Sequence, residues 1–273
     1  MSPAILCSTG VVTRDPDRTD HRQILEHGDK LGTAALEVAV YEAWYGHLDE
    51  VVEDLRASSF SFPVVHAEKG IGSGLGSDNG DELEDALQHL EINCRAAAAL
   101  GAKTLILHLW ELPAGDATIE RNLAQLPACL DTADAYNVAL AVETIVGSSG
   151  TSLANLRLAL ERDPRCRATL DSEFLGFHGQ LAESISADWL WADNRVRHVH
   201  IKDFDGRLRV GGERRYLLPG EGSLDLNGFL GGLVERGYNG AITLEASALT
   251  SSGELDDGRL AQIAAVVREL AGS

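Results

Sequence analysis

Eight short apolar runs, spaced along the whole chain, constrain its fold more than any other feature of the sequence. Most of them are nearly continuous in Val, Ile, Leu and Ala, which is typical of parallel strands that are covered on both faces. The runs are Ala4–Ser8, Ala35–Val40, Phe62–Ala67, Lys103–Leu109, Val138–Thr144, Arg167–Asp171, Val196–Lys202 and Ala241–Glu245. The sequence therefore predicts eight buried strands.

Amphipathic stretches with helical spacing separate the runs. The clearest begins at Glu82, repeats leucines every three or four residues, and stops at Gly101, a residue type that commonly ends helices. Similar stretches cover residues 123–135, 153–160, 226–233 and 260–270. Eight strand-helix units in 273 residues match an α/β protein of the (β/α)8 TIM barrel type, which typically has about 250 residues. With no long linker in view, we predict one TIM-barrel domain over residues 1–273.

A doubly wound open sheet is the alternative fold, and a Gly-rich turn after the first strand would indicate it. The sequence at 7–10, CSTG, lacks that motif. A glycine-rich segment at 70–76 follows the third run, but it lacks the Gly-Lys-Ser/Thr ending of a phosphate-binding loop. We therefore prefer the barrel, and we expect residues 70–76 to form a flexible loop.

Acidic residues outnumber basic residues by 42 to 23, which gives a formal net charge of -19. Because nucleic-acid binding depends on Lys and Arg that neutralise phosphates, this charge argues against DNA, RNA and anionic membranes as partners. The four cysteines form no C-x-x-C pair, and no signal peptide or apolar run of roughly 18 residues is visible. We expect a cytoplasmic protein with buried, reduced cysteines.

Six consecutive predicted strands end in an acidic or imidazole side chain, at the end where a barrel of this type forms its active site. They are His66, His108, Glu143, Asp171, His200 and Glu245. Any one of them alone is typical of a helix cap or a structural histidine, but carboxylates gathered in one ring repel unless a cation lies between them. Three carboxylates and one imidazole from this ring therefore predict a divalent metal site. Its oxygen donors favour Mn²⁺ or Mg²⁺, its imidazole also allows Co²⁺, Zn²⁺, Ni²⁺ or Fe²⁺, and we favour Mn²⁺.

Five segments, taken in order, resemble the xylose-isomerase-like TIM-barrel superfamily, also called the sugar phosphate isomerase/epimerase family. They are ALAVE at 139–143, ATLD at 168–171, HVHIKD at 198–203, PGEGSLD at 219–225 and GAITLE at 240–245. The resemblance covers essentially the whole chain. The superfamily also contains the type IV AP endonucleases, so the resemblance implies a fold and a site more directly than one reaction.

The resemblance implies a metal bound by Glu143, Asp171, His200 and Glu245, with Glu143 and Glu245 also acting as catalytic proton carriers. The implied reaction is isomerisation or epimerisation of a small sugar or related hydroxy-ketone through a metal-stabilised enediolate. Loss of water after the same proton abstraction would instead give a dehydratase of a keto-cyclitol or dehydroshikimate-like substrate. An AP endonuclease-like phosphodiesterase and a non-catalytic sugar-binding barrel are alternatives of other classes. A small carbohydrate-like molecule is the expected partner, and a homo-oligomer is compatible with the family.

One position departs from the family pattern. Members commonly have a His three residues after the sixth-strand Asp, and Phe174 occupies that position here. The replacement removes one ligand or substrate hydrogen bond but leaves the four predicted metal ligands. Glu173 could compensate for the missing His, or it could cap a helix or face solvent.

Five side chains are predicted to line the substrate pocket: His66, His108, Trp110, Glu173 and Lys202. His66 and His108 match positions that bind extra metals in the endonuclease branch, and we prefer a pocket role for them. Lys202 shares a strand face with His200 and could contact substrate or form a structural ion pair. Trp110 could stack on a sugar or close the barrel mouth. Arginines at 207–215 could contact a phosphorylated substrate.

Overall fold

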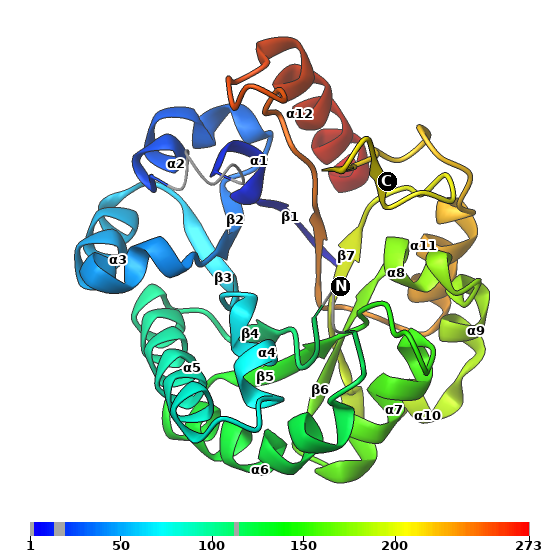
Figure 1. Ribbon diagram of the computed structural model, residues 1–273. Helices are drawn as coiled ribbons and strands as arrows, with labels where there is room; N and C mark the ends of the chain where they lie inside the picture. The colour runs from blue at the N-terminus through cyan, green and yellow to red at the C-terminus, as the bar shows by residue number, and fades with distance from the viewer. Residues whose placement is uncertain (1–2, 14–19, 112–114, 273) are drawn as a thin grey trace.

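The computed structural model describes residues 3–13, 20–111 and 115–272, and its main feature is a closed barrel of eight parallel strands surrounded by helices (Figure 1). The ring closes because β1 pairs with both β2 and β10. The strands are β1 Ala4–Ser8, β2 Ala35–Ala39, β3 Ser61–His66, β4 Thr104–Leu107, β5 Ala139–Glu143, β6 Arg167–Asp171, β7 Val196–Ile201 and β10 Ala241–Leu244. The predicted (β/α)8 barrel is confirmed, and the open sheet is wrong.

The five predicted helices are present: α5 Gly80–Leu100, α6 Ile119–Ala135, α7 Ser152–Arg162, α11 Leu226–Glu235 and α12 Asp257–Gly272. The side chain of Asn79 caps the start of α5, and Gly101, at φ 80°, ends it. Shorter helices complete the units: α1 Gly10–Thr13, α2 Arg22–His27, α3 Leu48–Ala57, α4 Gly70–Leu75, α8 Ser172–Phe177, α9 Leu181–Ser186 and α10 Asp188–Trp191. Within the described ranges, no helix is both long and apolar enough to cross a membrane.

The glycine-rich segment is a helix, so the prediction of a flexible loop at 70–76 is wrong. Helix α4 forms there because it packs against α5 and α6, and its glycines allow a very close approach. A Cβ added to Gly72 would lie 2.1 Å from the carbonyl oxygen of His108. Asn122 joins the two segments by donating hydrogen bonds of 2.7 Å to the carbonyls of Gly72 and Leu109. The glycines therefore bring α4 against the end of β4.

The interior of the barrel changes from apolar to polar along its axis. A small apolar cluster within the barrel consists of Leu6, Val64 and Ile106, packed with Ala35 and Ala241. Side chains in a strand alternate between faces, so the residues two positions later point into the same interior. His66 follows Val64 by this spacing, and His108 follows Ile106. The apolar layer therefore lies beneath the polar side chains at the carboxyl end.

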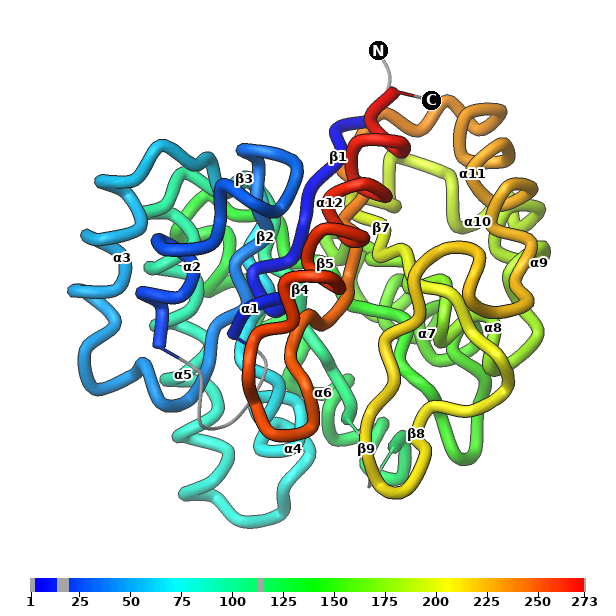
Figure 2. Tube along the Cα trace, turned by 90° about the horizontal axis from the view of Figure 1, so that it is seen from above, coloured from blue at the N-terminus to red at the C-terminus, as the bar shows by residue number. Residues whose placement is uncertain are grey.

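Two loops approach that carboxyl end. The loop after β7 contains the hairpin of β8 Arg209–Val210 and β9 Glu213–Arg214, which lies opposite the start of β1 (Figure 2). The loop after β5 is held by Asp116, which accepts hydrogen bonds of 2.6 to 2.9 Å from residues 148–150 and Asn155. Burial alone would raise the pKa of Asp116, but these hydrogen bonds lower it well below its usual range. Asp116 is therefore ionised at neutral pH.

Candidate metal centre and active site

The six predicted strand-end residues converge inside the carboxyl end of the barrel, and none of them is more than 3% exposed. Three are the final residues of their strands: His66, Glu143 and Asp171. His200 is next to last in β7, and the remaining two directly follow β4 and β10. Barrel closure brings these ends into one ring, which is why residues far apart in the sequence meet here.

The centre of the ring is a group formed by Glu143, Asp171 and His200, whose nearest donor atoms all lie within 4.8 Å of one another. His200 Nδ1 lies 2.9 Å from Glu143 Oε1 and 3.8 Å from Asp171 Oδ2. Glu245 is more distant, with its Oε2 4.0 Å from the same nitrogen. The structure thus brings three of the predicted metal ligands tightly together and places the fourth at their edge.

Lys202 lies between Glu245 and the central group. Its ammonium is 2.6 Å from Asp171 Oδ2 and 3.5 Å from Glu173 Oε2, and it forms an ion pair with Glu245 Oε2. Burial alone would lower the pKa of Lys202, but Asp171 and Glu245 raise it well above its usual range. The side chain is therefore a buried cation among three carboxylates.

Burial and close charged neighbours shift the pKa values of the three residues in the central group. Burial alone would raise the pKa of Glu143, but the imidazoles of His200 and His108 lower it well below its usual range. Burial raises the pKa of Asp171 to about 6, with Lys202 opposing and the neighbouring glutamates adding to the increase. Burial would lower the pKa of His200, whereas Glu37 and Glu143 raise it well above its usual value. The site is a concentration of negative charge that attracts cations.

This donor set fits a divalent metal ion. Two carboxylates and one imidazole converge on one buried point, and Asp171 Oδ2 lies 2.6 Å from an ammonium, so a cation is already favourable beside it. A metal held by all four predicted ligands would take carboxylate oxygens that Lys202 now contacts. The donors are compatible with several divalent ions and do not select among them.

His66 and His108 form a second group of donors with Glu143. His108 Nε2 lies 2.7 Å from Glu143 Oε2 and 3.2 Å from His66 Nε2. On its other side, His108 Nδ1 contacts Glu111, a residue that the sequence pattern did not single out. Burial would lower the pKa of His108, but Glu111 and Glu143 raise it to about 9. Both histidines thus border the central group.

Phe174 and Glu173 occupy the first turn of α8 beside Lys202. The ring of Phe174 lies 4.9 Å from the Lys202 ammonium, while its amide donates to Asp171, which is the residue that caps the helix. Glu173 is buried and pairs with both terminal nitrogens of Arg214 from the β8–β9 hairpin. A capping or solvent role for Glu173 is therefore wrong. Its carboxylate is held at the edge of the site by a neighbouring arginine.

The structure separates the arginines of the loop after β7. Arg214 reaches the site, whereas Arg207 and Arg215 pair with Asp205. Arg209 is exposed and donates to a backbone carbonyl in the hairpin. Of the arginines expected to contact a phosphorylated substrate, Arg214 is thus the one that reaches the site, and it is already paired with Glu173.

Trp110 is 1% exposed and lies in the main hydrophobic core. Its indole nitrogen donates a hydrogen bond of 3.3 Å to the carbonyl of Ile145 in the loop after β5. Trp189 and Trp191 lie in α10 and pack against the same core. Trp110 thus supports a loop at the carboxyl end of the barrel.

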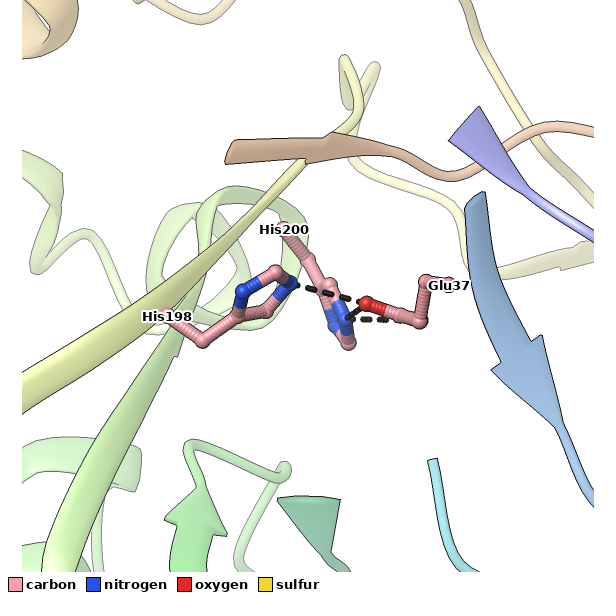
Figure 3. Close-up of side chains that lie close together, drawn as sticks. All are labelled: Glu37, His198 and His200. Carbon is pink, nitrogen blue, oxygen red and sulfur yellow. Dashed lines mark hydrogen bonds and ion pairs between the residues drawn. The ribbon is translucent and has the colours of Figure 1, made fainter. Parts of the chain in front are cut away.

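Two buried residues near His200 were not among the predicted site residues. Glu37 contacts His200, and His198 contacts Glu37. Glu37 from β2 and His198 from β7 lie on either side of the His200 ring in Figure 3. All three residues are fully buried. Two features of the sequence could have drawn attention to these residues. Glu37 is a charged residue in the middle of an apolar run, and His198 is a second histidine two positions before His200. Neither shows where the partner lies, because β2 and β7 are not neighbours in the barrel.

A closed parallel barrel with buried carboxylates and imidazoles at the carboxyl ends of its strands defines the class of this protein. The chain belongs to the xylose isomerase-like TIM barrel family, whose model matches residues 26–269. The predicted family resemblance is therefore confirmed. A search of curated protein sequences found no match.

Solved structures with the same fold include several sugar epimerases. A D-tagatose 3-epimerase-like protein is 18% identical, with a TM-score of 0.72 over 98% of this chain and 97% of its own. The D-allulose 3-epimerase from Methylomonas sp., solved with D-allulose, is 18% identical, with a TM-score of 0.71 over 99% and 94%. An IOLI protein with a bound zinc atom is 16% identical, with a TM-score of 0.65 over 98% and 96%. These similarities establish the fold across nearly the whole chain.

Proposed function

We propose that this protein is a divalent-metal-dependent isomerase or epimerase of a small sugar or related hydroxy-ketone. The observation that carries the proposal is the convergence of Glu143, Asp171 and His200 in one buried group at the carboxyl end of the barrel, with Glu245 at its edge. Sugar epimerases among the structures of the same fold support the substrate class. The zinc atom in the IOLI protein supports a metal site in such a barrel.

The chain's own residues can supply proton transfer. Glu143 reaches the centre of the ring, where its carboxylate could accept a proton from a carbon next to a carbonyl. Glu245 directly follows β10, and its contact with Lys202 holds its carboxylate 4.0 Å from the same His200 nitrogen that Glu143 contacts. A bound divalent ion would polarise the carbonyl and hydroxyl oxygens of the substrate. Burial excludes water, which strengthens these electrostatic effects.

The dehydratase alternative uses the same residues. Abstraction of the proton beside a carbonyl is common to both reactions, and they differ in whether the proton returns or a neighbouring hydroxyl leaves. A positively charged Lys202 within the site could assist a departing oxygen, which keeps a keto-cyclitol or dehydroshikimate-like substrate in the test panel. Products with one water fewer than the substrate would identify this branch.

Phosphodiester hydrolysis is the candidate from another class, and the second donor group favours it. His66, His108 and Glu143 could hold a further metal ion. Against it, Phe174 replaces a family ligand and the net charge of -19 opposes nucleic-acid binding. Two measurements separate the epimerase from the phosphodiesterase. Elemental analysis of the purified protein should find one metal ion per chain, and a binding assay at low salt should detect no DNA binding.

Solvent exchange tests the main proposal. The Mn²⁺-loaded protein is incubated in D₂O with a panel of ketoses and keto-inositols, and NMR follows the signal of the proton next to the carbonyl. We expect deuterium to replace that proton in at least one compound. No exchange with any member of a broad panel, in protein shown to contain metal, would count against proton-transfer chemistry.

Carboxylate variants show which residues move the proton. Glu143→Gln and Glu245→Gln should each slow exchange by about 10²–10⁴-fold, the usual contribution of a general acid or base. Metal binding should weaken only in part, because three of the four proposed ligands remain. Glu53→Gln, at an exposed position in α3, is the matched control and should exchange like the unaltered protein. Full activity in both site variants would refute the proton-carrier assignment.

A further inference from the structure

A buried chain of contacts crosses the barrel interior directly beneath the proposed metal centre. His200 Nε2 lies 3.0 and 3.2 Å from the two carboxylate oxygens of Glu37, and His198 Nε2 lies 2.8 Å from Glu37 Oε2 (Figure 3). All three side chains are 0% exposed. The contacts join β7 to β2, which are separated in the barrel by β1 and β10.

The two nitrogens of His200 have different roles in this arrangement. Nδ1 faces the central group, 2.9 Å from Glu143, whereas Nε2 faces Glu37. A carboxylate accepts hydrogen bonds only, so when Nδ1 binds a metal, the remaining ring proton lies on Nε2 and points toward Glu37.

His198 has a complementary role toward Glu37. It approaches the same carboxylate oxygen that His200 contacts, and it comes from the same strand, two residues earlier. The buried ring of His198 lies 2.8 Å from Glu37 Oε2, so it limits the rotation of that carboxylate.

We propose that Glu37 and His198 are positioning residues that orient His200 and fix its tautomer for metal binding through Nδ1. Neither residue reaches the central group, so they act through His200. Carboxylates that accept a hydrogen bond from a metal-bound imidazole commonly strengthen its binding to the metal, and their loss typically costs 10- to 100-fold in metal affinity. The inference rests on the proposed function in one respect, since it requires that the central group binds a metal.

Metal affinity and the visible spectrum of bound Co²⁺ test the inference together. The full-length protein and its Glu37→Gln variant are titrated with Co²⁺ against a competing chelator. We expect Glu37→Gln to weaken binding by about 10- to 100-fold and to change the Co²⁺ absorption bands, because Gln can donate to Nε2 and favour the wrong tautomer. A role limited to stability would lower Tm but leave the spectrum of bound Co²⁺ unchanged.

Two further variants keep the test decisive. Thr169→Val is the matched control, because Thr169 is fully buried in the neighbouring β6 and its hydroxyl has no hydrogen-bond partner within the described part of the chain. It should bind Co²⁺ like the unaltered protein. If Glu37→Gln does not fold, His198→Leu removes one contact from Glu37 while His200 stays, and it should weaken binding in the same direction.

The outcomes separate the two proposals. If the unaltered protein binds no Co²⁺, the metal-dependent function fails, and the positioning role fails with it. If the unaltered protein binds Co²⁺ and the Glu37 and His198 variants bind it with the same affinity and spectrum, the positioning role alone is refuted. Weakened binding with altered bands supports the positioning role even if no sugar substrate is found.

Discussion

Lys202 balances three carboxylates at the edge of the proposed metal centre, so its replacement by Met should have a large effect. It is 2% exposed, and its ammonium lies 2.6 Å from Asp171 and 3.5 Å from Glu173, in addition to its ion pair with Glu245. Removing one partner of a buried ion pair costs about 3–5 kcal/mol, because the remaining charges stay buried without compensation. We expect Lys202→Met to lose about this much free energy of unfolding when no metal is present.

Thermal unfolding in EDTA and in Mn²⁺ measures this effect. For a domain of this size, 1 kcal/mol corresponds to a shift in Tm of about 2–4 °C, so Tm in EDTA should fall by about 6–20 °C. Mn²⁺ can neutralise the same carboxylates in the variant without first displacing an ammonium. The increase in Tm on adding Mn²⁺ should therefore be larger for Lys202→Met than for the unaltered protein.

Lys103→Met is the matched control, because Lys103 is exposed and its loss should change stability by about 0.5 kcal/mol or less. Two results would refute the reasoning about Lys202. If Lys202→Met unfolds in EDTA at the temperature of the control, the ammonium does not balance the three carboxylates. If Mn²⁺ raises the Tm of Lys202→Met and of the unaltered protein equally, the metal and Lys202 do not compete for the same carboxylate oxygens.

Three further predictions concern the loop after β5, helix α4 and the metal. Asp116→Asn should cost about 2–4 kcal/mol at pH 7, because it weakens hydrogen bonds to a charged acceptor. The pKa of Asp116 is lowered in the folded state, so its contribution is present above pH ~4 and lost as pH falls through the folded pKa. Urea unfolding at pH 7 and pH 3 should show a smaller difference between the proteins at pH 3, and a constant difference would contradict this. Gly72→Ala should cost more than about 2 kcal/mol in urea unfolding because its Cβ would meet a backbone carbonyl, whereas Gly231→Ala, which has open space, should change stability by about 1 kcal/mol or less. Equal effects would refute the close approach of α4. Removal of metal by EDTA should lower Tm of the unaltered protein, and no change would show that the folded chain had bound none.

Local patterns in the sequence predicted the strands well, and the helices where the apolar spacing was regular. The boundaries of β1 and β6 agree with the predicted runs, whereas the fourth run, predicted over 103–109, forms a strand only over Thr104–Leu107. The error at residues 70–76 has a physical cause. Glycine lowers helix propensity, but here it also permits a backbone contact with β4 that no larger residue would allow, and packing outweighs propensity.

The site was predictable only where it depended on strand ends. His66, Glu143 and Asp171 end their strands, and parallel closure brings such ends together whatever lies between them. The role of Glu173 was not predictable, because its partner Arg214 lies 41 residues away in a hairpin that no apolar pattern marks. The contact exists because the hairpin folds back over the barrel mouth.

By itself, the sequence determined the barrel and the polarity of its carboxyl end, because strand alternation and apolar periodicity are local properties of the chain. Only the tertiary structure decided which charges meet. Glu37 and His200 lie 163 residues apart on strands that are not neighbours, and they touch because the sheet closes and directs both side chains toward one axis. In the same way, closure places Lys202 among the carboxylates that were predicted to hold a metal.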